Sequence, residues 1–411
     1  MSFRSVFIAI VLGTSLILAA FIVNSYRPPA VTNQPTPDLV RASGRCAECH
    51  RNQEYSIVHE YELSVHAKKN VNCLECHQPA QGQKSRDHQG FTLNTKVTAA
   101  NCRSCHEQVY QEFLRSRHAA PSWAAVHGDK DFTAEQVAFS EKYHPGACKR
   151  PPNPLVMREG PAAVQSGCSA CHSVGKPNED GTIGTCTACH TRHTSSVEVA
   201  RLPRTCGQCH MGPDHSQLEI YEESRHGVLF EAQRKLLNLT ASPKELTTRD
   251  MFVPTCTTCH MSGLNGLNVT HDTTERLSYH LAAEVSDKRP TYQQGQERMK
   301  SVCLQCHTKP VVDRVYKEAE AVVQATNDKV LAAKAIVEGL RKEGLLDKPF
   351  EKPIDFEYFD LWHYYGRTSK HGAFMGGSDF VQWHGNYPML KHTVELKVKA
   401  EEMRRLHAKK D

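Results

Sequence analysis

The chain has 411 residues, 17 cysteines, 24 histidines and a formal net charge of +5. Aromatic residues make up only 7% of the sequence, so the polypeptide itself supplies few large apolar groups for a core. Sixteen of the cysteines share one repeated pattern, which excludes a disulfide scaffold, a cytosolic thiol enzyme and a disordered chain. The small net charge gives no reason to expect a nucleic-acid partner. The remaining cysteine, Cys148, is expected to be a buried small apolar residue rather than a reactive thiol.

The N-terminal residues 1–27 contain an unbroken low-charge run from Val6 to Val23. This run reaches the lower limit for a membrane span, which is about 18 residues, and it lacks a clear small-residue cleavage site. We expect residues 1–27 to be an export signal that stays as a membrane anchor, with a cleaved signal as the alternative. Residues 28–40 are rich in proline and are expected to form an extended linker.

Eight copies of the pattern Cys-x-x-Cys-His follow. Two thiols three residues apart bridge the two vinyl groups of one porphyrin, and the adjoining histidine reaches the iron as its proximal ligand. Paired Cys-x-x-Cys units also bind zinc, but zinc does not require a histidine after the second cysteine, and all eight copies have one. The attachment cysteines are Cys46, Cys49, Cys73, Cys76, Cys102, Cys105, Cys168, Cys171, Cys186, Cys189, Cys206, Cys209, Cys256, Cys259, Cys303 and Cys306. The proximal histidines are His50, His77, His106, His172, His190, His210, His260 and His307.

These motifs predict eight covalently bound haem c groups. The porphyrins would supply the apolar area that the chain lacks. Many of the Lys and Arg side chains would balance the negative charges of the haem propionates. Because c-type haem is attached outside the cytoplasm, we expect a periplasmic or other extracytoplasmic location.

A second histidine on each iron would complete its coordination, and sixteen histidines lie outside the motifs. Three of them close a repeated phrase, in which an aromatic residue stands five positions before the histidine and a serine two positions before it. The repetition predicts a helix end that presents an imidazole to a haem. The expected distal ligands are these three, His66, His118 and His226, together with His193, His271 and His280. Further candidates are His371, His384 and His392. The count alone does not identify an iron that is left open.

The chain is expected to be mainly α, a multihaem cytochrome c with a haem-packed N-terminal part and long C-terminal helices. Residues 41–310 are expected to form an octahaem-binding domain of short helices and loops, and residues 311–411 a helical C-terminal domain. Within the C-terminal domain, residues 311–346 lack proline, and their apolar residues recur with a period near 3.6 residues. This pattern predicts a long amphipathic helix. Residues 351–388 are aromatic-rich without a haem motif, and residues 390–411 predict a charged helix.

Three stretches carry a resemblance beyond the haem motifs: CGQCHMGPDHSQLEIYEESRHG (206–227), PTCTTCHMSGLNGLNVTHDTTERLSYH (254–280) and HYYGRTSKHGAFMGGSDFVQWHGNYP (363–388). With eight motifs in this order, the sequence resembles the octahaem hydroxylamine oxidoreductase family over most of residues 40–395. The resemblance implies redox chemistry on small nitrogen compounds at one haem, attached through the fourth motif. It also implies that the other seven haems have two histidine ligands and carry electrons.

By this resemblance the catalytic haem is held by Cys168, Cys171 and His172, and the adjacent Asp214 and His215 lie over its iron. A carboxylate beside an imidazole can relay protons to or from a bound nitrogen–oxygen ligand. The alternatives are that Asp214 and His215 cap a helix start, or that His215 is an ordinary haem ligand.

The resemblance further implies a distal tyrosine, for which Tyr279 and Tyr292 are the candidates. In oxidative members a tyrosine from the C-terminal region of a neighbouring subunit bonds covalently to the catalytic haem, and members without it work mainly as reductases. Phe374 stands at the expected place and has no phenol oxygen. Nearby tyrosines are Tyr364, Tyr365 and Tyr387. Phe374 therefore slightly favours reduction of nitrite or hydroxylamine over oxidation of hydroxylamine to NO or nitrite.

The resemblance also implies a homotrimer with C-terminal helices that cross between subunits, and an electron-transfer protein or quinol-linked partner. The alternative function is a non-catalytic, membrane-tethered electron-transfer cytochrome, which predicts eight six-coordinate haems and no role for Asp214. A third function, an octahaem sulfur-oxyanion reductase, is disfavoured because the sequence has no Cys-x-x-Cys-Lys site and contains the phrase MGPDHS.

Overall fold

The computed structural model describes residues 44–409, so the predicted anchor (1–27) and linker (28–40) lie outside the described residues. By its internal contacts the chain divides into one unit that ends at Cys73 and a second that runs from Leu74 to Asp411. None of the described helices is long and apolar enough to cross a bilayer.

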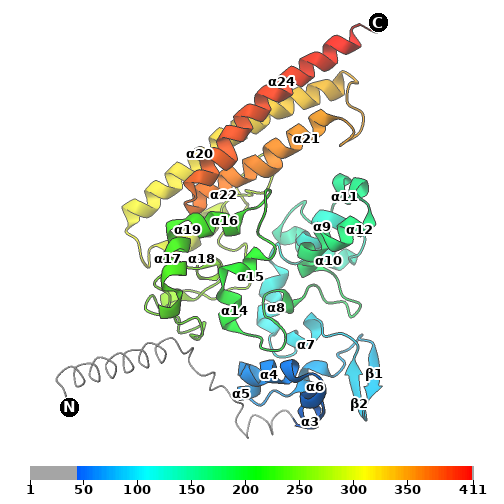
Figure 1. The fold of residues 1–411 in the computed structure, drawn as a ribbon, viewed down its shortest axis with the longest axis vertical. Helices are drawn as coiled ribbons and strands as arrows, with labels where there is room; N and C mark the ends of the chain where they lie inside the picture. The colour runs from blue at the N-terminus through cyan, green and yellow to red at the C-terminus, as the bar shows by residue number, and fades with distance from the viewer. Residues whose placement is uncertain (1–43, 410–411) are drawn as a thin grey trace, which may run out of the picture. The chain divides into compact units, whose positions relative to one another are not determined.

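The described chain is mainly α, as predicted (Figure 1). Its strands, within the described residues, are the antiparallel hairpin β1 (Ser85–His88) and β2 (Phe91–Asn94), in which Ser85 pairs with Asn94. The first unit contains α3 (Gly44–Gln53), α4 (Tyr55–Leu63) and α5 (Val65–Lys68), and α6 (Cys73–His77) begins at its end. The haem-binding part of the second unit contains α7 (Ala99–Arg103), α8 (Glu107–Leu114), α9 (Ala120–His127), α10 (Ala134–Tyr143), α11 (Pro154–Glu159), α12 (Pro161–Ser166), α13 (Cys168–His172), α14 (Val197–Arg201), α15 (Pro203–Gly207), α16 (Gln217–Glu223), α17 (Arg225–Gln233), α18 (Cys256–His260) and α19 (Tyr292–Cys303). Its short 3₁₀ turns are η1 (Ser173–Gly175), η2 (Cys186–Ala188), η3 (Arg234–Leu236) and η4 (Leu264–Gly266).

The attachment motifs fold as single helical turns. Because the second cysteine lies three residues after the first and the histidine four residues after it, the three side chains leave one face of the turn. In four motifs that run past the end of a helix or 3₁₀ turn, the histidine amide donates to the carbonyl of the first cysteine at 2.9–3.0 Å. These four histidines are His106, His190, His210 and His307. The motif spacing therefore sets the local backbone as well as the haem chemistry.

Two of the three copies of the repeated phrase, those ending at His66 and His226, share one local structure. The serine ends one helix and starts the next, because the Ser64 hydroxyl accepts from the Ala67 amide at 3.0 Å and the Ser224 hydroxyl accepts from the Gly227 amide at 3.2 Å. The histidine is then the second residue of the new helix, α5 or α17. The prediction of a helix end is confirmed for His66 and His226, where the serine explains why the chain changes direction. His118 instead lies in the turn between α8 and α9, and its amide donates to the Ser116 hydroxyl at 3.1 Å.

Two small apolar clusters support the haem-binding part. One contains the fully buried Cys148 beside Ala120, Ala124 and Ile183, so the expectation of a buried, apolar role for this cysteine is confirmed. The other gathers side chains that follow the sixth motif, including Tyr221, whose hydroxyl donates to the Pro254 carbonyl at 3.0 Å. Both clusters are small, in keeping with a part of the chain that carries seven of the eight motifs between residues 73 and 307.

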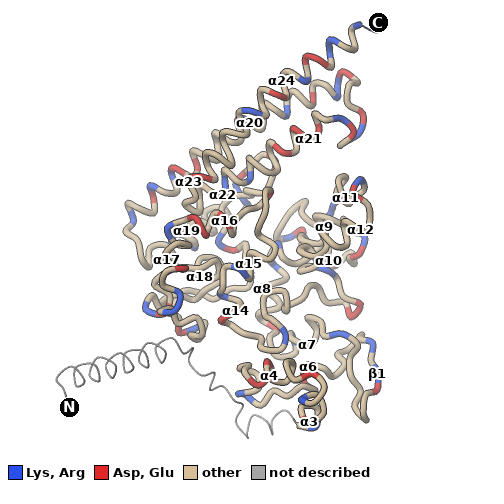
Figure 2. Tube along the Cα trace, viewed as in Figure 1, with Lys and Arg blue, Asp and Glu red and all other residues tan. Residues whose placement is uncertain are grey.

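The C-terminal part has an apolar core of its own. The predicted long helix is α20 (Lys309–Lys342), and the predicted charged helix is α24 (Tyr387–His407). With α21 (Pro353–Phe359) they lie side by side in Figure 1. Their buried side chains form one cluster with Leu361, the second residue after α21, and this cluster includes Val337, Leu340, Met389 and Leu396. Figure 2 shows charges of both signs spaced along these helices, which is typical of helices with one apolar face.

The aromatic-rich segment between α21 and α24 continues as helix with two π-helical stretches. These are η5 (Asp360–Gly366) and η6 (Gln382–Asn386), separated by α22 (Arg367–Met375) and α23 (Ser378–Val381). π-Helical turns are rare and occur often at functional sites, because they redirect side chains relative to a regular helix. The stretch η5 leads directly into Arg367, the first residue of α22.

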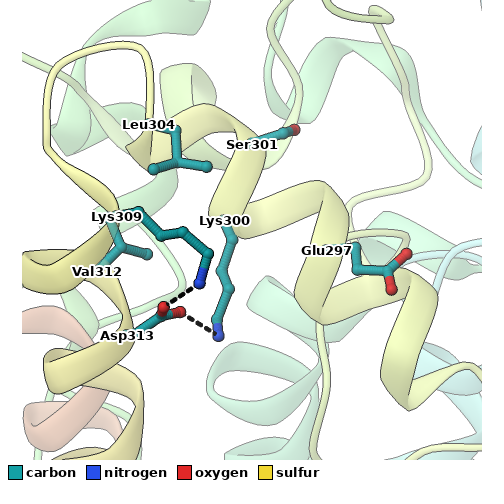
Figure 3. Close-up of a pocket in the computed structure, with 7 residues that line it drawn as sticks. All are labelled: Glu297, Lys300, Ser301, Leu304, Lys309, Val312 and Asp313. Atoms are coloured by element: carbon teal, nitrogen blue, oxygen red, sulfur yellow. Dashed lines mark hydrogen bonds and ion pairs between the residues drawn. The ribbon is translucent and has the colours of Figure 1, made fainter.

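Figure 3 shows the junction between α19 and α20, just after the eighth motif. Asp313 accepts a hydrogen bond from Lys300 of α19 at 3.0 Å and another from Lys309, so it ties the two helices together. The hollow beside this ion pair contains none of the predicted site residues. It is therefore not the candidate site.

The C-terminal core makes a stability prediction. Replacing the fully buried Leu396 with alanine should destabilise the protein by about 2–5 kcal/mol, because the cavity loses apolar contacts. Thermal unfolding of the holoprotein measures this as a lower melting temperature. The control is Leu331→Ala on α20, where the side chain is 48% exposed and the melting temperature should stay nearly unchanged. Equal shifts for both variants would contradict the assignment of Leu396 to the core.

Candidate haem ligands and catalytic site

Four predicted proximal histidines each face a predicted distal histidine. With metal–nitrogen bonds of about 2 Å, as imidazole makes with zinc, two imidazoles on one iron place their ring centroids about 6 Å apart. The four pairs have centroid distances of 5.8–6.5 Å. They are His77 with His193, His118 with His210, His190 with His271, and His226 with His307. The residues present therefore fit haems held between two histidines.

The pair of His118 and His210 shows how the ligand atoms are chosen. Their Nε2 atoms face each other at 3.5 Å. The Nδ1 atom of His210 lies 3.3 Å from the Gln217 Oε1 atom, and the Nδ1 atom of His118 lies 3.3 Å from the Thr273 hydroxyl. Partners on Nδ1 fix the ring and leave Nε2 for the metal. Burial lowers the pKa of His118 to about 3, so its imidazole is neutral, as a ligand must be.

The remaining predicted ligands are placed differently. His66 is the second residue of α5 in the first unit. The Nδ1 atom of His280 lies 2.8 Å from Asp287, and His371 buries an Nδ1 atom that has no hydrogen-bond partner. His384 stacks on Phe380 and pairs with Asp379, and His392 stacks on Tyr365 and pairs with Glu357. The structure does not bring His280, His384 or His392 into a facing pair with a motif histidine.

His172 of the fourth motif has a tightly held ring. Its Nδ1 atom donates to the Ser122 carbonyl at 2.6 Å, and the Ser122 hydroxyl donates back to the His172 carbonyl at 3.0 Å. Among residues 44–409, no imidazole forms a facing pair with His172. The same holds for His260, but the surroundings differ. Burial lowers the pKa of His172, and the charges of His215, Asp214 and Arg367 also act on it, whereas Arg276 and His210 act on His260.

Asp214 and His215 lie together in the loop before α16. The Oδ2 atom of Asp214 is 3.2 Å from the His215 Nε2 atom, and His215 buries an Nδ1 atom without a hydrogen-bond partner. The helix α16 starts after Ser216 without a side-chain cap, so the geometry does not support a capping role for Asp214. Although the rings of His210 and His215 are 5.9 Å apart, His210 already directs its Nε2 atom at His118. This argues against His215 as the second ligand of the sixth haem.

Two site residues escaped the sequence analysis, His363 and Arg367. The Arg367 Nη1 atom lies 4.0 Å from Asp214 Oδ2, and its guanidinium lies over the Trp362 ring at 5.1 Å. His363 stacks on Phe359, and burial lowers its pKa to about 2, with Arg367 and His215 adding to the effect. The signal for both was present in the third resembling stretch, but they belong to the π-helical η5 and its junction with α22, which no sequence period marks.

Two hydroxyl groups connect α22 to the loop that holds Asp214. The Thr368 hydroxyl donates to the Pro213 carbonyl at 3.2 Å and lies 3.3 Å from the Ser216 hydroxyl. Ser216 and Thr368 are both buried. The position of Arg367 relative to Asp214 is therefore set by contacts on either side of Asp214.

The predicted tyrosines lie elsewhere. The rings of Tyr279 and Tyr292 are 5.3 Å apart, and Phe374 packs on Tyr279 and on Tyr316. The structure places neither Tyr279 nor Tyr292 in contact with Asp214, and Phe374 belongs to this separate aromatic group. Its position within the chain gives no argument about the direction of the reaction. Burial raises the pKa of Tyr364, and the carboxylates of Asp360 and Asp214 raise it further.

Comparison with known proteins places the chain in a family. A family model described as seven times multi-haem cytochrome CxxCH matches residues 69–349. The chain belongs to this family of multihaem cytochromes. The matched residues contain seven of the eight motifs, and the first motif, Cys46–His50, precedes them.

Relatives of this multihaem cytochrome agree with the resemblance to hydroxylamine oxidoreductases. It is 25% identical over 407 residues to a probable nitrite reductase–hydroxylamine oxidoreductase fusion protein of Kuenenia stuttgartiensis. The aligned residues cover 84% of this chain and 43% of that relative. The chain thus spans less than half the length of that protein. A solved hypothetical multiheme protein has a TM-score of 0.76 and 20% identity, covering 91% of this chain and 100% of its own. A reducing HAO-like protein complex of Kuenenia stuttgartiensis has a TM-score of 0.67 and 21% identity, covering 92% of this chain and 89% of its own. These structural likenesses confirm the fold.

The facing pair of His118 and His210 can be tested by spectroscopy. In His118→Ala, one haem should lose its second imidazole, and the ferric holoprotein should gain one high-spin signal in electron paramagnetic resonance. The control is His384→Ala, because His384 is exposed and paired with Asp379. That variant should keep the wild-type spectrum. An unchanged spectrum in His118→Ala, with full haem content, would show that His118 is not a ligand.

Proposed function

We propose that this cytochrome interconverts small nitrogen compounds, nitrite or hydroxylamine, at the haem held by Cys168, Cys171 and His172, while seven further haems carry electrons. The observation that carries the proposal is the group formed by Asp214, His215 and Arg367. The charges of these three residues influence the pKa of His172, which has no facing imidazole among the described residues. Reduction is the favoured direction, supported by the similarity to a protein named as a probable nitrite reductase fusion. Oxidation of hydroxylamine to NO or nitrite is the alternative.

The bound haem supplies the electrons and the position at which the nitrogen compound binds. His172 would hold the iron of that haem through its Nε2 atom, because the Ser122 carbonyl already holds its Nδ1 atom. Reduction of nitrite consumes protons as well as electrons. Asp214 and His215 hold a proton between the Oδ2 and Nε2 atoms, and they transfer it to the oxygen of the substrate as a general acid. In the oxidative direction the same pair accepts protons from hydroxylamine.

A substitution of Asp214 distinguishes an enzyme from a pure electron carrier. Asp214→Asn keeps the shape of the side chain but removes its base, so turnover of nitrite and hydroxylamine should fall by about 10²-fold or more. The measurement is steady-state turnover with a reduced dye, normalised to haem content. Asp328→Asn on α20, where the residue is exposed, is the matched control and should keep full activity. Full activity in Asp214→Asn would refute the catalytic role of this pair. If the wild-type protein turned over neither substrate, the electron-carrier function would be the better account.

We further propose that the protein binds eight haems, including one at Cys46–His50, and that it works in the periplasm or an equivalent compartment. An N-terminal anchor would hold it near a quinol-linked or soluble electron partner. The motif chemistry supports this location, since covalent attachment of c-type haem takes place outside the cytoplasm.

An exposed apolar stripe supports self-association. Trp383, Tyr387, Leu390, Val394 and Val398 are each more than half exposed. Their spacing of three or four residues places them on one face of η6 and α24, opposite the face that carries the buried Leu396. A continuous exposed apolar stripe on a helix is typical of a surface covered by another helix. We propose that a second copy of this chain covers it, within a homotrimer.

The stripe predicts a change in assembly. Leu390→Glu should place a charge in the contact and convert trimers to monomers, because an unpaired buried charge is costly. Light scattering coupled to size-exclusion chromatography measures the mass. Leu236→Glu, at a side chain that is 73% exposed outside the stripe, should leave the mass unchanged. If wild type and Leu390→Glu had the same mass, the proposed contact would be wrong.

A further inference from the structure

Arg367 carries a buried charge whose hydrogen-bonding capacity is unused. Its side chain is only 15% exposed. A guanidinium has five N–H donors, yet Arg367 has no hydrogen bond to any described residue, and its Nε atom is buried without a partner. Its guanidinium lies over the Trp362 ring and reaches the Asp214 carboxylate only at 4.0 Å, the limit of an ion pair. A buried guanidinium with open donors is costly unless oxygen atoms fill them.

Asp214 does not fill these donors. The Oδ2 atom that lies 4.0 Å from Arg367 also lies 3.2 Å from His215, so the carboxylate is engaged more closely with the imidazole. The other nearby charges are positive. Burial, together with the charges of Arg117 and Arg150, lowers the pKa of Arg367 to about 10, while Asp214 opposes this change. Arg367 therefore keeps its charge at neutral pH. The charges of Arg117, Arg150 and Arg367 together outweigh the single carboxylate.

Contacts between neighbouring motifs relate this charge to the fourth motif. The guanidinium of Arg367 lies 4.0 Å from Asp214, in the loop just after the sixth motif, and the Cys171 Sγ atom of the fourth motif lies 3.8 Å from the Gln208 carbonyl oxygen of the sixth. Thr368, the residue after Arg367, is hydrogen-bonded to the Pro213 carbonyl beside Asp214, which fixes the backbone at Arg367. An open cation therefore stands next to the proton-relay pair, at the place where the substrate is proposed to bind.

We propose that Arg367 is a substrate-binding residue whose guanidinium pairs with the oxygen atoms of nitrite, so that the site binds this anion in preference to neutral hydroxylamine. The proposal rests on the proposed function and names the charge class of its substrate. A planar guanidinium matches two oxygens of a small anion with two parallel hydrogen bonds. Hydroxylamine is uncharged at neutral pH and has one oxygen, so it gains much less from the same group.

The test compares two substrates in one variant. In Arg367→Gln, the KM for nitrite should rise about 10- to 100-fold, the effect of losing a charge-assisted pair. The KM for hydroxylamine should change less than about threefold by the same reasoning. Optical titration of the ferric holoprotein with sodium nitrite gives a second reading that needs no turnover, and its Kd should rise by the same factor as the KM. Arg367→Lys keeps the charge but loses the planar fork, so its nitrite Kd should lie between the values for wild type and Arg367→Gln.

The matched control is Arg314→Gln on α20, where the arginine is exposed and pairs with Glu318. Both KM values and the nitrite Kd should stay at wild-type levels there. A parallel rise of the nitrite and hydroxylamine KM values in Arg367→Gln, or a change in haem potentials with an unchanged nitrite Kd, would overturn the proposal and indicate that Arg367 pairs with a haem propionate. If Arg367→Gln loses haem, the comparison is made on Arg367→Lys, and a wild-type nitrite Kd there together with an unchanged KM ratio overturns it.

The two proposals fail in different ways. If wild type turns over both substrates but Arg367→Gln binds nitrite as well as wild type does, the inference about Arg367 is wrong and the proposed function stands. If wild type binds nitrite in an Arg367-dependent way but converts neither substrate, the anion site stands and the proposed catalytic function is wrong.

Discussion

The structure depends on one constraint, the placement of two imidazoles on opposite sides of a haem that is covalently fixed to the chain. The motif Cys-x-x-Cys-His satisfies the first half locally, because one helical turn places both thiols and the proximal histidine on the same face. The second half is not local. A distal imidazole has to lie about 6 Å from the proximal ring with its Nε2 atom directed at the iron, and it comes from residues as distant as His226 for His307 or His118 for His210.

This constraint explains the uneven core of the molecule. In the haem-binding part the helices are short and the apolar clusters small, because the predicted porphyrins would take the place of large side chains. The C-terminal part carries no motif, and there α20, α21 and α24 bury a continuous set of valine, leucine and methionine side chains. The two parts meet in sequence at Asp313, which joins the helix of the eighth motif to α20.

Much of this architecture could be predicted from the sequence, and the failures have physical causes. The motifs, the long helix α20 and the histidines of the repeated phrase have local signals, namely fixed spacing, apolar periodicity and a capping serine. In the sequence, His384 and His392 were candidate distal ligands in the same way as His193. In the fold they pair instead with the carboxylates of Asp379 and Glu357. Arg367 belongs to the third resembling stretch, but its place beside Asp214 could not be predicted because Asp214 is far away in sequence. The nominated tyrosines, Tyr279 and Tyr292, were placed by resemblance alone, and they belong to a separate aromatic group with Phe374.

The hydrogen bond from Thr368 to Pro213 divides the site between two parts of the chain. All eight motifs and the pair Asp214–His215 precede α20, so every cysteine needed for haem attachment lies before the C-terminal helices. The cation and the hydroxyl that fix the Asp214 loop come from Arg367 and Thr368 of α22. A chain that ended before Arg367 would therefore keep its haem-attachment motifs but lose the contacts that position Asp214.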